Sequence, residues 1–118
     1  MKINIILIAI ILHFIFDWIL QPRDIAKNKG NDTKGIENVL YHMLINILPF
    51  SFIVGLIIIN IFDYNIDHTI EILSLNFTSH FLIDVLLPKG KNERQIINWT
   101  ALDQILHLTI LIILLTKF

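Results

Sequence analysis

The sequence predicts an all-α fold, a bundle of four transmembrane helices that forms a single integral membrane domain over residues 1–118. The first reason is composition: 55% of the residues are hydrophobic and 16% are charged, against about 25% charged in an average soluble domain. A domain this small has too little interior to bury so many apolar side chains in water. The second reason is that four stretches approach the roughly 20 mostly apolar residues that a transmembrane helix needs.

The composition also excludes several classes of protein. Cysteine is absent, so the chain has no disulfides, no thiolate metal site and no cysteine nucleophile. The net charge is −1, which gives no field that would attract a polyanion, and no nucleic-acid partner is expected.

The predicted spans cover residues 3–20, 38–62, 68–87 and 99–118. The first span could be mistaken for a signal peptide, but its apolar stretch is too long, it contains His13 and Asp17, and no A-x-A cleavage site follows. The third span is the least apolar of the four, so we expect its polar residues to face neighbouring helices rather than lipid.

Two polar segments, 21–37 and 88–98, separate the spans and contain glycine, proline and most of the charges. Both are predicted to be hairpin connections. Together they hold seven of the nine basic residues: Arg23, Lys27, Lys29, Lys34, Lys89, Lys91 and Arg94. By the positive-inside rule, both hairpins are cytoplasmic and both termini lie outside.

Three aspartates lie well inside the spans, and each is four residues from a histidine. The pairs are His13/Asp17, His80/Asp84 and Asp103/His107. This spacing puts both members of a pair on one helical face. An aspartate at the centre of a span costs about 2.5–3.5 kcal/mol on insertion scales. Each aspartate is four residues from its predicted cytoplasmic boundary, about 6 Å deep, and His42 in the second span falls near the same level.

Imidazole and carboxylate without thiolate suit zinc, manganese, iron, cobalt or nickel. We therefore predict a site for one or two divalent transition-metal ions, with zinc as first choice. The predicted ligands are His13, Asp17, His42, His80, Asp84, Asp103 and His107. The three aspartates are also the candidate catalytic residues, as general bases. Four amides are expected to orient these ligands by hydrogen bonds: Gln21, Asn38, Asn46 and Gln104.

A weak internal repeat accompanies this pattern. HFIFDWIL at 13–20 is similar to HFLIDVLL at 80–87, and a basic hairpin follows each segment. The repeat predicts two helical hairpins related by an axis along the membrane normal.

The motifs form a familiar set: H-x-x-x-D…LQ in the first span, AKNK after it, a lone histidine in the second, H-x-x-x-D in the third and DQ-x-x-H in the fourth. This set resembles the domain-of-unknown-function 3307 family, small inner-membrane proteins of bacteria and their phages. The matching residues are His13, Asp17, Leu20, Gln21, Ala26–Lys29, His42, His80, Asp84, Asp103, Gln104 and His107. One departure is Leu87, where the family tends to have a lysine.

The chain is also similar, more distantly, to the LexA-regulated membrane-bound metal-dependent hydrolases. The family resemblance implies a location in the bacterial cytoplasmic membrane and strengthens the prediction of fold and site. The family label names no substrate, so it adds little to the prediction of function.

The leading functional hypothesis is a metal-dependent membrane hydrolase. It would act near the cytoplasmic face on a lipid-like or membrane-proximal phosphoester, ester or amide, with membrane lipid as its partner, as a monomer or homodimer. One alternative is a transporter of protons, small ions or small molecules, which would need an oligomer because four short helices leave little room for a pathway. Another is a non-enzymatic bacterial or phage membrane protein that binds a partner. Under the simplest alternative, the polar residues only hold the helices together.

Overall fold

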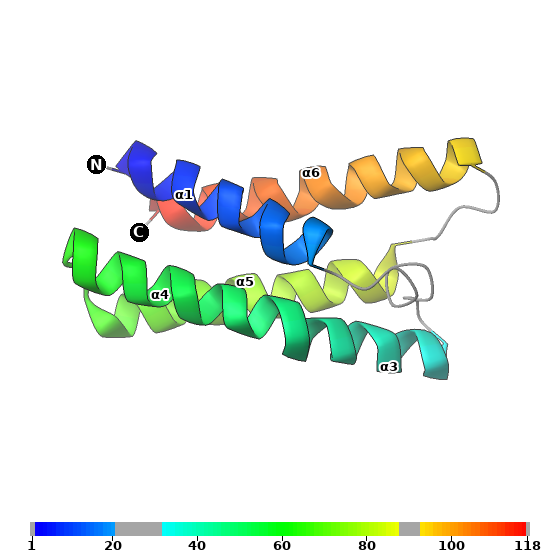
Figure 1. Ribbon diagram of the computed structural model, residues 1–118, viewed down its shortest axis with the longest axis horizontal. Coiled ribbons are helices and arrows are strands. Elements are labelled where there is room, and N and C mark those ends of the chain that lie inside the picture. Colours follow the sequence, from blue (N-terminus) through cyan, green and yellow to red (C-terminus); the bar gives the residue numbers. More distant parts are fainter. Residues whose placement is uncertain (1, 21–31, 88–92, 118) are drawn as a thin grey trace.

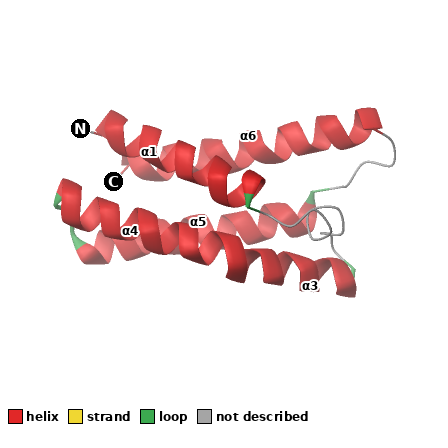
Figure 2. Ribbon diagram, viewed as in Figure 1, coloured by secondary structure: helices red, strands yellow, loops and turns green. Residues whose placement is uncertain are grey.

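A computed structural model describes residues 2–20, 32–87 and 93–117, and within these ranges all the secondary structure is helical (Figures 1 and 2). The helices form four rods. They are α1 (Lys2–Phe14) with the π-helix η1 (Ile15–Ile19); α3 (Thr33–His42), the π-helix η2 (Met43–Ile47) and α4 (Leu48–Phe62); α5 (Ile66–Leu86); and α6 (Glu93–Lys117). The predicted all-α bundle of four helices is confirmed.

The four rods close into a ring. The α1 helix packs against α4 and α6, and α5 packs against the same two helices from the other side. Consecutive rods run in opposite directions, so α1 begins and α6 ends at the same end of the bundle (Figure 1). In any bundle whose helices alternate in direction, the first and third rods, here α1 and α5, are parallel. Their parallel orientation therefore does not test the internal repeat, which stays a prediction.

Three segments are long and apolar enough to cross a membrane: Thr33–Phe62, Ile66–Leu86 and Ile97–Thr116. The apolar part of the first rod, Ile3–Asp17, is shorter, so three of the four predicted spans reach full length within the described residues. Polarity is inverted relative to a soluble protein. Phe52 is 68% exposed and Leu86 is 70% exposed, while His42 and Asp84 are completely buried. This distribution fits a bundle whose outer face meets lipid.

Two helices begin earlier than the hydropathy pattern predicts. The α3 helix starts at Thr33 and α6 starts at Glu93, five and six residues before the predicted spans. The Asp32 side chain caps α3 by accepting a hydrogen bond from the Gly35 N–H at 2.6 Å. Polar first turns contribute nothing to hydropathy, which is why the hydropathy pattern places both in the hairpins 21–37 and 88–98. The rest of these hairpins, 21–31 and 88–92, lies outside the described residues.

The two π-helical turns interrupt the first and second rods. The Leu20 N–H donates to the Ile15 carbonyl at 2.9 Å, and the Leu48 N–H donates to the Met43 carbonyl. Pro49 accounts for the second, because proline lacks an N–H and its ring clashes with the carbonyl four residues earlier. We find no comparable cause for the first. Such turns often occur at functional sites.

Apolar side chains around the buried polar residues pack in two groups. The larger group lies towards the chain termini and contains Ile5, Ala9, Phe50, Val54, Ile58, Ile72, Leu111 and Leu115. The smaller group joins Val39, Met43 and Ile47 to aromatic side chains of α5. The Phe50 ring lies edge-on to His13, with centroids 6.0 Å apart, so the larger group directly adjoins the polar residues.

Gly55 brings α4 close to α5. A Cβ atom at this position would lie 2.9 Å from Leu73 Cδ1, which is the movable end of a side chain. We expect Gly55→Ala to lower the melting temperature by only a few degrees. Gly55→Leu should cost the roughly 1–3 kcal/mol of an overpacked core. Thermal unfolding in detergent, followed by circular dichroism, measures both. Equal stability of Gly55→Leu and wild type would contradict this close approach.

Candidate metal centre

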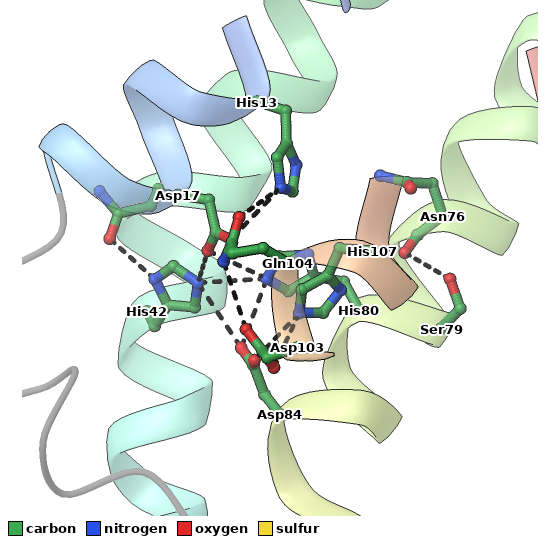
Figure 3. Close-up of polar contacts among 11 residues, drawn as sticks. His13, Asp17, His42, Asn76, Ser79, His80, Asp84, Asp103, Gln104 and His107 are labelled. Atoms are coloured by element: carbon green, nitrogen blue, oxygen red, sulfur yellow. Dashed lines mark hydrogen bonds and ion pairs between the residues drawn. The ribbon is translucent and has the colours of Figure 1, made fainter. Parts of the chain in front are cut away.

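The structure brings all seven predicted ligands together inside the bundle (Figure 3). All are buried, from His42 and Asp84 at 0% exposed to Asp103 at 7%. The first rod supplies His13 and Asp17, α3 supplies His42, α5 supplies His80 and Asp84, and α6 supplies Asp103 and His107. We call these seven residues the polar cluster.

Four donor atoms of the polar cluster form a compact set, which we call the first position: Asp17 Oδ1, His42 Nε2, His80 Nε2 and Asp84 Oδ2. His42 Nε2 lies 2.8 Å from Asp17 Oδ1, 3.2 Å from His80 Nε2 and 3.6 Å from Asp84 Oδ2. His80 Nε2 lies 3.4 Å from Asp17 Oδ1 and 3.3 Å from Asp84 Oδ2. Ligands about 2.0–2.1 Å from a tetrahedral zinc ion are roughly 3.3 Å apart. The five separations fit such an ion.

Asn46 orients His42 for this role. Its Oδ1 lies 3.1 Å from His42 Nδ1. An amide oxygen accepts hydrogen bonds, so Nδ1 donates to Asn46 and Nε2 is the nitrogen left for an ion. His42 Nε2 faces His80 Nε2 at 3.2 Å and Asp17 Oδ1 at 2.8 Å, and a cation among these three atoms would satisfy all of them. Hydrogen bonding at the far nitrogen of a histidine is the usual support for a metal ligand.

A second group of contacts lies next to the first position. His107 Nε2 is 3.2 Å from Asp84 Oδ1 and 3.3 Å from Asp103 Oδ1. Among the described residues, Asp103 Oδ1 accepts no hydrogen bond although it is buried. The His80 and His107 rings stack with centroids 3.8 Å apart and an interplanar angle of 15°.

Gln104 connects three members of the polar cluster. Its Nε2 donates to Asp17 Oδ2 at 2.8 Å and to Asp103 Oδ2 at 3.3 Å, and its Oε1 lies 3.2 Å from His13 Nε2. The carboxylates can only accept, which fixes the amide orientation and makes His13 the donor to Gln104. His13 Nε2 is also 3.4 Å from Asp17 Oδ2. His13 Nε2 therefore contacts both the Gln104 amide and the Asp17 carboxylate.

Asn38 and Gln21 are the other two residues that the sequence predicts to orient the ligands. Asn38 is half-buried on α3, one turn before His42. Gln21 lies outside the described residues. Sequence reasoning missed Phe50, which covers His13, because nothing in its spacing separates it from other core residues.

The structure brings the three aspartates together (Figure 3), but they lie at different distances from the ends of their own helices. Asp17 and Asp84 lie two residues before the ends of η1 and α5, whereas Asp103 lies ten residues after the start of α6. The reason is that α3 and α6 extend about 15 Å beyond the polar cluster, while the other two rods end beside it (Figure 1).

An apolar groove of about 440 Å³ runs along α6 next to Phe14 of α1. Its α6 wall includes Ile97, Ala101 and Leu108, and it also includes Gln104. The groove therefore reaches a side chain that contacts the polar cluster.

The polar cluster can hold a divalent cation. Three overlapping triads of histidine and aspartate have ligand atoms within 4.8 Å of one another: His13/Asp17/His80, His42/His80/Asp84 and Asp17/Asp103/His107. Neutral imidazole and carboxylate are ligands for zinc and its neighbours in the first transition row.

In a comparison with protein families, the model described as "Protein of unknown function (DUF3307)" matches residues 5–118. Comparison with curated proteins and with solved structures gives no match. The matched range contains the whole polar cluster, and the more distant similarity to metal-dependent hydrolases finds no support in these comparisons.

Proposed function

The chain belongs to the DUF3307 family, and from its polar cluster we propose that it is a metal-dependent membrane hydrolase. The observation that carries the proposal is the first position, where three rods bring two histidines and two carboxylates into contacts of 2.8–3.6 Å, close to the separation of zinc ligands. Zinc is the first choice of ion because the ligands are histidine and aspartate without thiolate.

Each part of the polar cluster has a role in this proposal. The polar cluster has no serine or cysteine that could act as the nucleophile. A bound divalent ion would supply one instead, because it lowers the pKa of water enough for hydroxide to form at neutral pH. His42 and His80 would hold the ion, and the charges of Asp17 and Asp84 would balance it in a low-dielectric surrounding. Asp103, whose Oδ2 accepts a hydrogen bond from Gln104 at 3.3 Å, would take the proton of the water as general base.

The groove supports a lipid-like substrate. Its volume of about 440 Å³ lies within the roughly 300–1,000 Å³ of small-molecule sites. An apolar chain lying between Phe14 and Leu108 would bring its polar end to Gln104, and Gln104 contacts Asp17 and Asp103. A phosphoester, ester or amide at that end would meet the polar cluster.

The transporter alternative is less well supported. The contacts of the polar cluster join the four rods sideways at one level of the bundle (Figure 3). Towards the termini, Phe50, Val54 and Leu111 pack in the larger apolar group with 1–2% exposure. A path for ions along the bundle would have to cross this group.

Hydrolysis can be tested on the purified full-length protein in detergent. We expect zinc-loaded protein to cleave long-chain nitrophenyl phosphate, phosphodiester or acyl ester probes. EDTA should abolish turnover and added zinc should restore it, because the reaction needs the ion. Asp103→Asn should lose at least about 100-fold in turnover, at the lower end for a general base. Protein that binds zinc and cleaves none of these probes would contradict the proposal.

We further propose that the basic hairpins face the cytoplasm, since seven of the nine basic residues lie in them. His68 at the start of α5 and Lys34 at the start of α3 are exposed at opposite ends of the bundle. A cysteine at position 34 should react with a membrane-impermeant maleimide only after the cells are opened, and one at position 68 should react in intact spheroplasts. The reverse pattern would place the termini inside.

A further inference from the structure

We propose that the polar cluster holds two metal ions that share Asp84, and that the second of them is the reactive one. The inference rests on the metal-binding part of the proposed function. Its first support is the way in which the Asp84 carboxylate divides its contacts. Oδ2 lies 3.3 Å from His80 Nε2 in the first position, and Oδ1 lies 3.2 Å from His107 Nε2. A carboxylate with different histidines at its two oxygens is arranged as a bridge.

The stacked histidines give the second support. The His80 and His107 rings are nearly parallel with centroids 3.8 Å apart. Both present Nε2 to the same carboxylate, so the two nitrogens lie on the same side of the stack. Two-metal sites hold their ions about 3.5–4 Å apart. The stack therefore offers one ligand to each of two ions at the separation that such sites use.

The second position has fewer protein ligands than the first. Its donors are His107 Nε2, Asp84 Oδ1 and Asp103 Oδ1, and His107 Nε2 lies 3.2 Å from the first oxygen and 3.3 Å from the second. Asp17 is also within reach of Asp103 and His107, but its Oδ1 belongs to the first position and its Oδ2 accepts from Gln104. The first position has four donors. Structural zinc sites are closed by four protein ligands, whereas catalytic sites use three and leave a place for water or substrate. The second position is therefore where substrate would bind.

Charge balance gives the third support and indicates the class of ligand. The polar cluster contains three carboxylates and neither lysine nor arginine. When every histidine binds as a neutral ligand, one divalent ion leaves one negative charge unbalanced, which is costly inside a membrane. Two ions would leave one positive charge, and a single anionic ligand neutralises it. The second position thus favours the anionic oxygen of a phosphoester over a neutral ester or amide.

Manganese provides a direct test, because two neighbouring Mn²⁺ ions give an exchange-coupled EPR spectrum. Full-length wild-type protein in detergent, saturated with Mn²⁺, should bind two ions per chain and show the coupled spectrum. Asp103→Asn and His107→Gln should each bind one ion and show the six-line spectrum of isolated Mn²⁺. Asp67→Asn, the same change at an exposed residue of α5, should behave as wild type.

Inorganic phosphate tests the ligand class on the same samples. Millimolar phosphate should alter the coupled spectrum of wild type and leave the single-ion spectrum of Asp103→Asn unchanged. One Mn²⁺ per chain in saturated wild type, two uncoupled ions, or a coupled pair in Asp103→Asn would overturn the inference. The outcome is separable from that of the proposed function. Two coupled ions without hydrolysis would refute only the activity, and hydrolysis with a single bound ion would refute only the second position.

Discussion

Asp84→Asn is expected to remove bound metal while leaving the fold intact or more stable. Asp84 is completely buried and its oxygens lie 3.2–3.6 Å from three histidines. Loss of a residue that merely orients a ligand weakens metal binding about 10–100-fold, so loss of a direct ligand to both positions should exceed that range. An amide still hydrogen-bonds between helices and costs less to bury than a carboxylate. Metal content by ICP mass spectrometry and melting temperature in detergent measure the two effects.

Asp67→Asn is the matched control for this variant, because Asp67 lies on the same helix and is exposed. Asp67→Asn should change neither the metal content nor the melting temperature, because it does not remove a buried carboxylate. If Asp84→Asn kept its full metal content and changed only the melting temperature, the aspartate would be a packing residue. The polar cluster would then hold the helices together without binding an ion.

His80→Ala should have the largest combined effect of any single change. His80 is 2% exposed, and its Nε2 lies 3.4 Å from Asp17 Oδ1 and 3.3 Å from Asp84 Oδ2. Its removal takes a nitrogen ligand from the first position and leaves two buried carboxylates facing a void. Removing one partner from a buried charged pair typically costs about 3–5 kcal/mol. We expect both metal content and melting temperature to fall strongly.

His68→Ala provides the comparison, since it removes the same residue type from the exposed first turn of the same helix. Metal content should be the same as in wild type. Equal metal content in His80→Ala and His68→Ala would show that the first position is not a metal site. His42→Ala tests the same position from a different rod and should reproduce the metal loss of His80→Ala.

Much of the fold follows from local pattern. The helical bundle and the approximate limits of α4, α5 and most of α6 follow from runs of apolar residues, because hydropathy depends only on a short stretch of chain. The polar first turn of α3 could have been found from its capping aspartate, Asp32, whereas hydropathy shows neither this turn nor the first turn of α6. The shorter apolar length of the first rod and the π turn at Ile15–Ile19 have no signal that we can identify in the sequence.

The candidate site also has features that follow from the sequence and features that only the tertiary structure decides. Spacing alone selected the seven residues of the polar cluster, because histidine and aspartate four residues apart share a helical face and are too costly in a span to occur there without a role. By itself, the sequence determined which residues the cluster contains. Only the tertiary structure decided which atoms meet: the division of Asp84 between His80 and His107, the stacking of those rings, and the contacts of Gln104. These depend on how each rod is rotated and shifted against its neighbours, which packing and the π turns fix together and no single segment encodes.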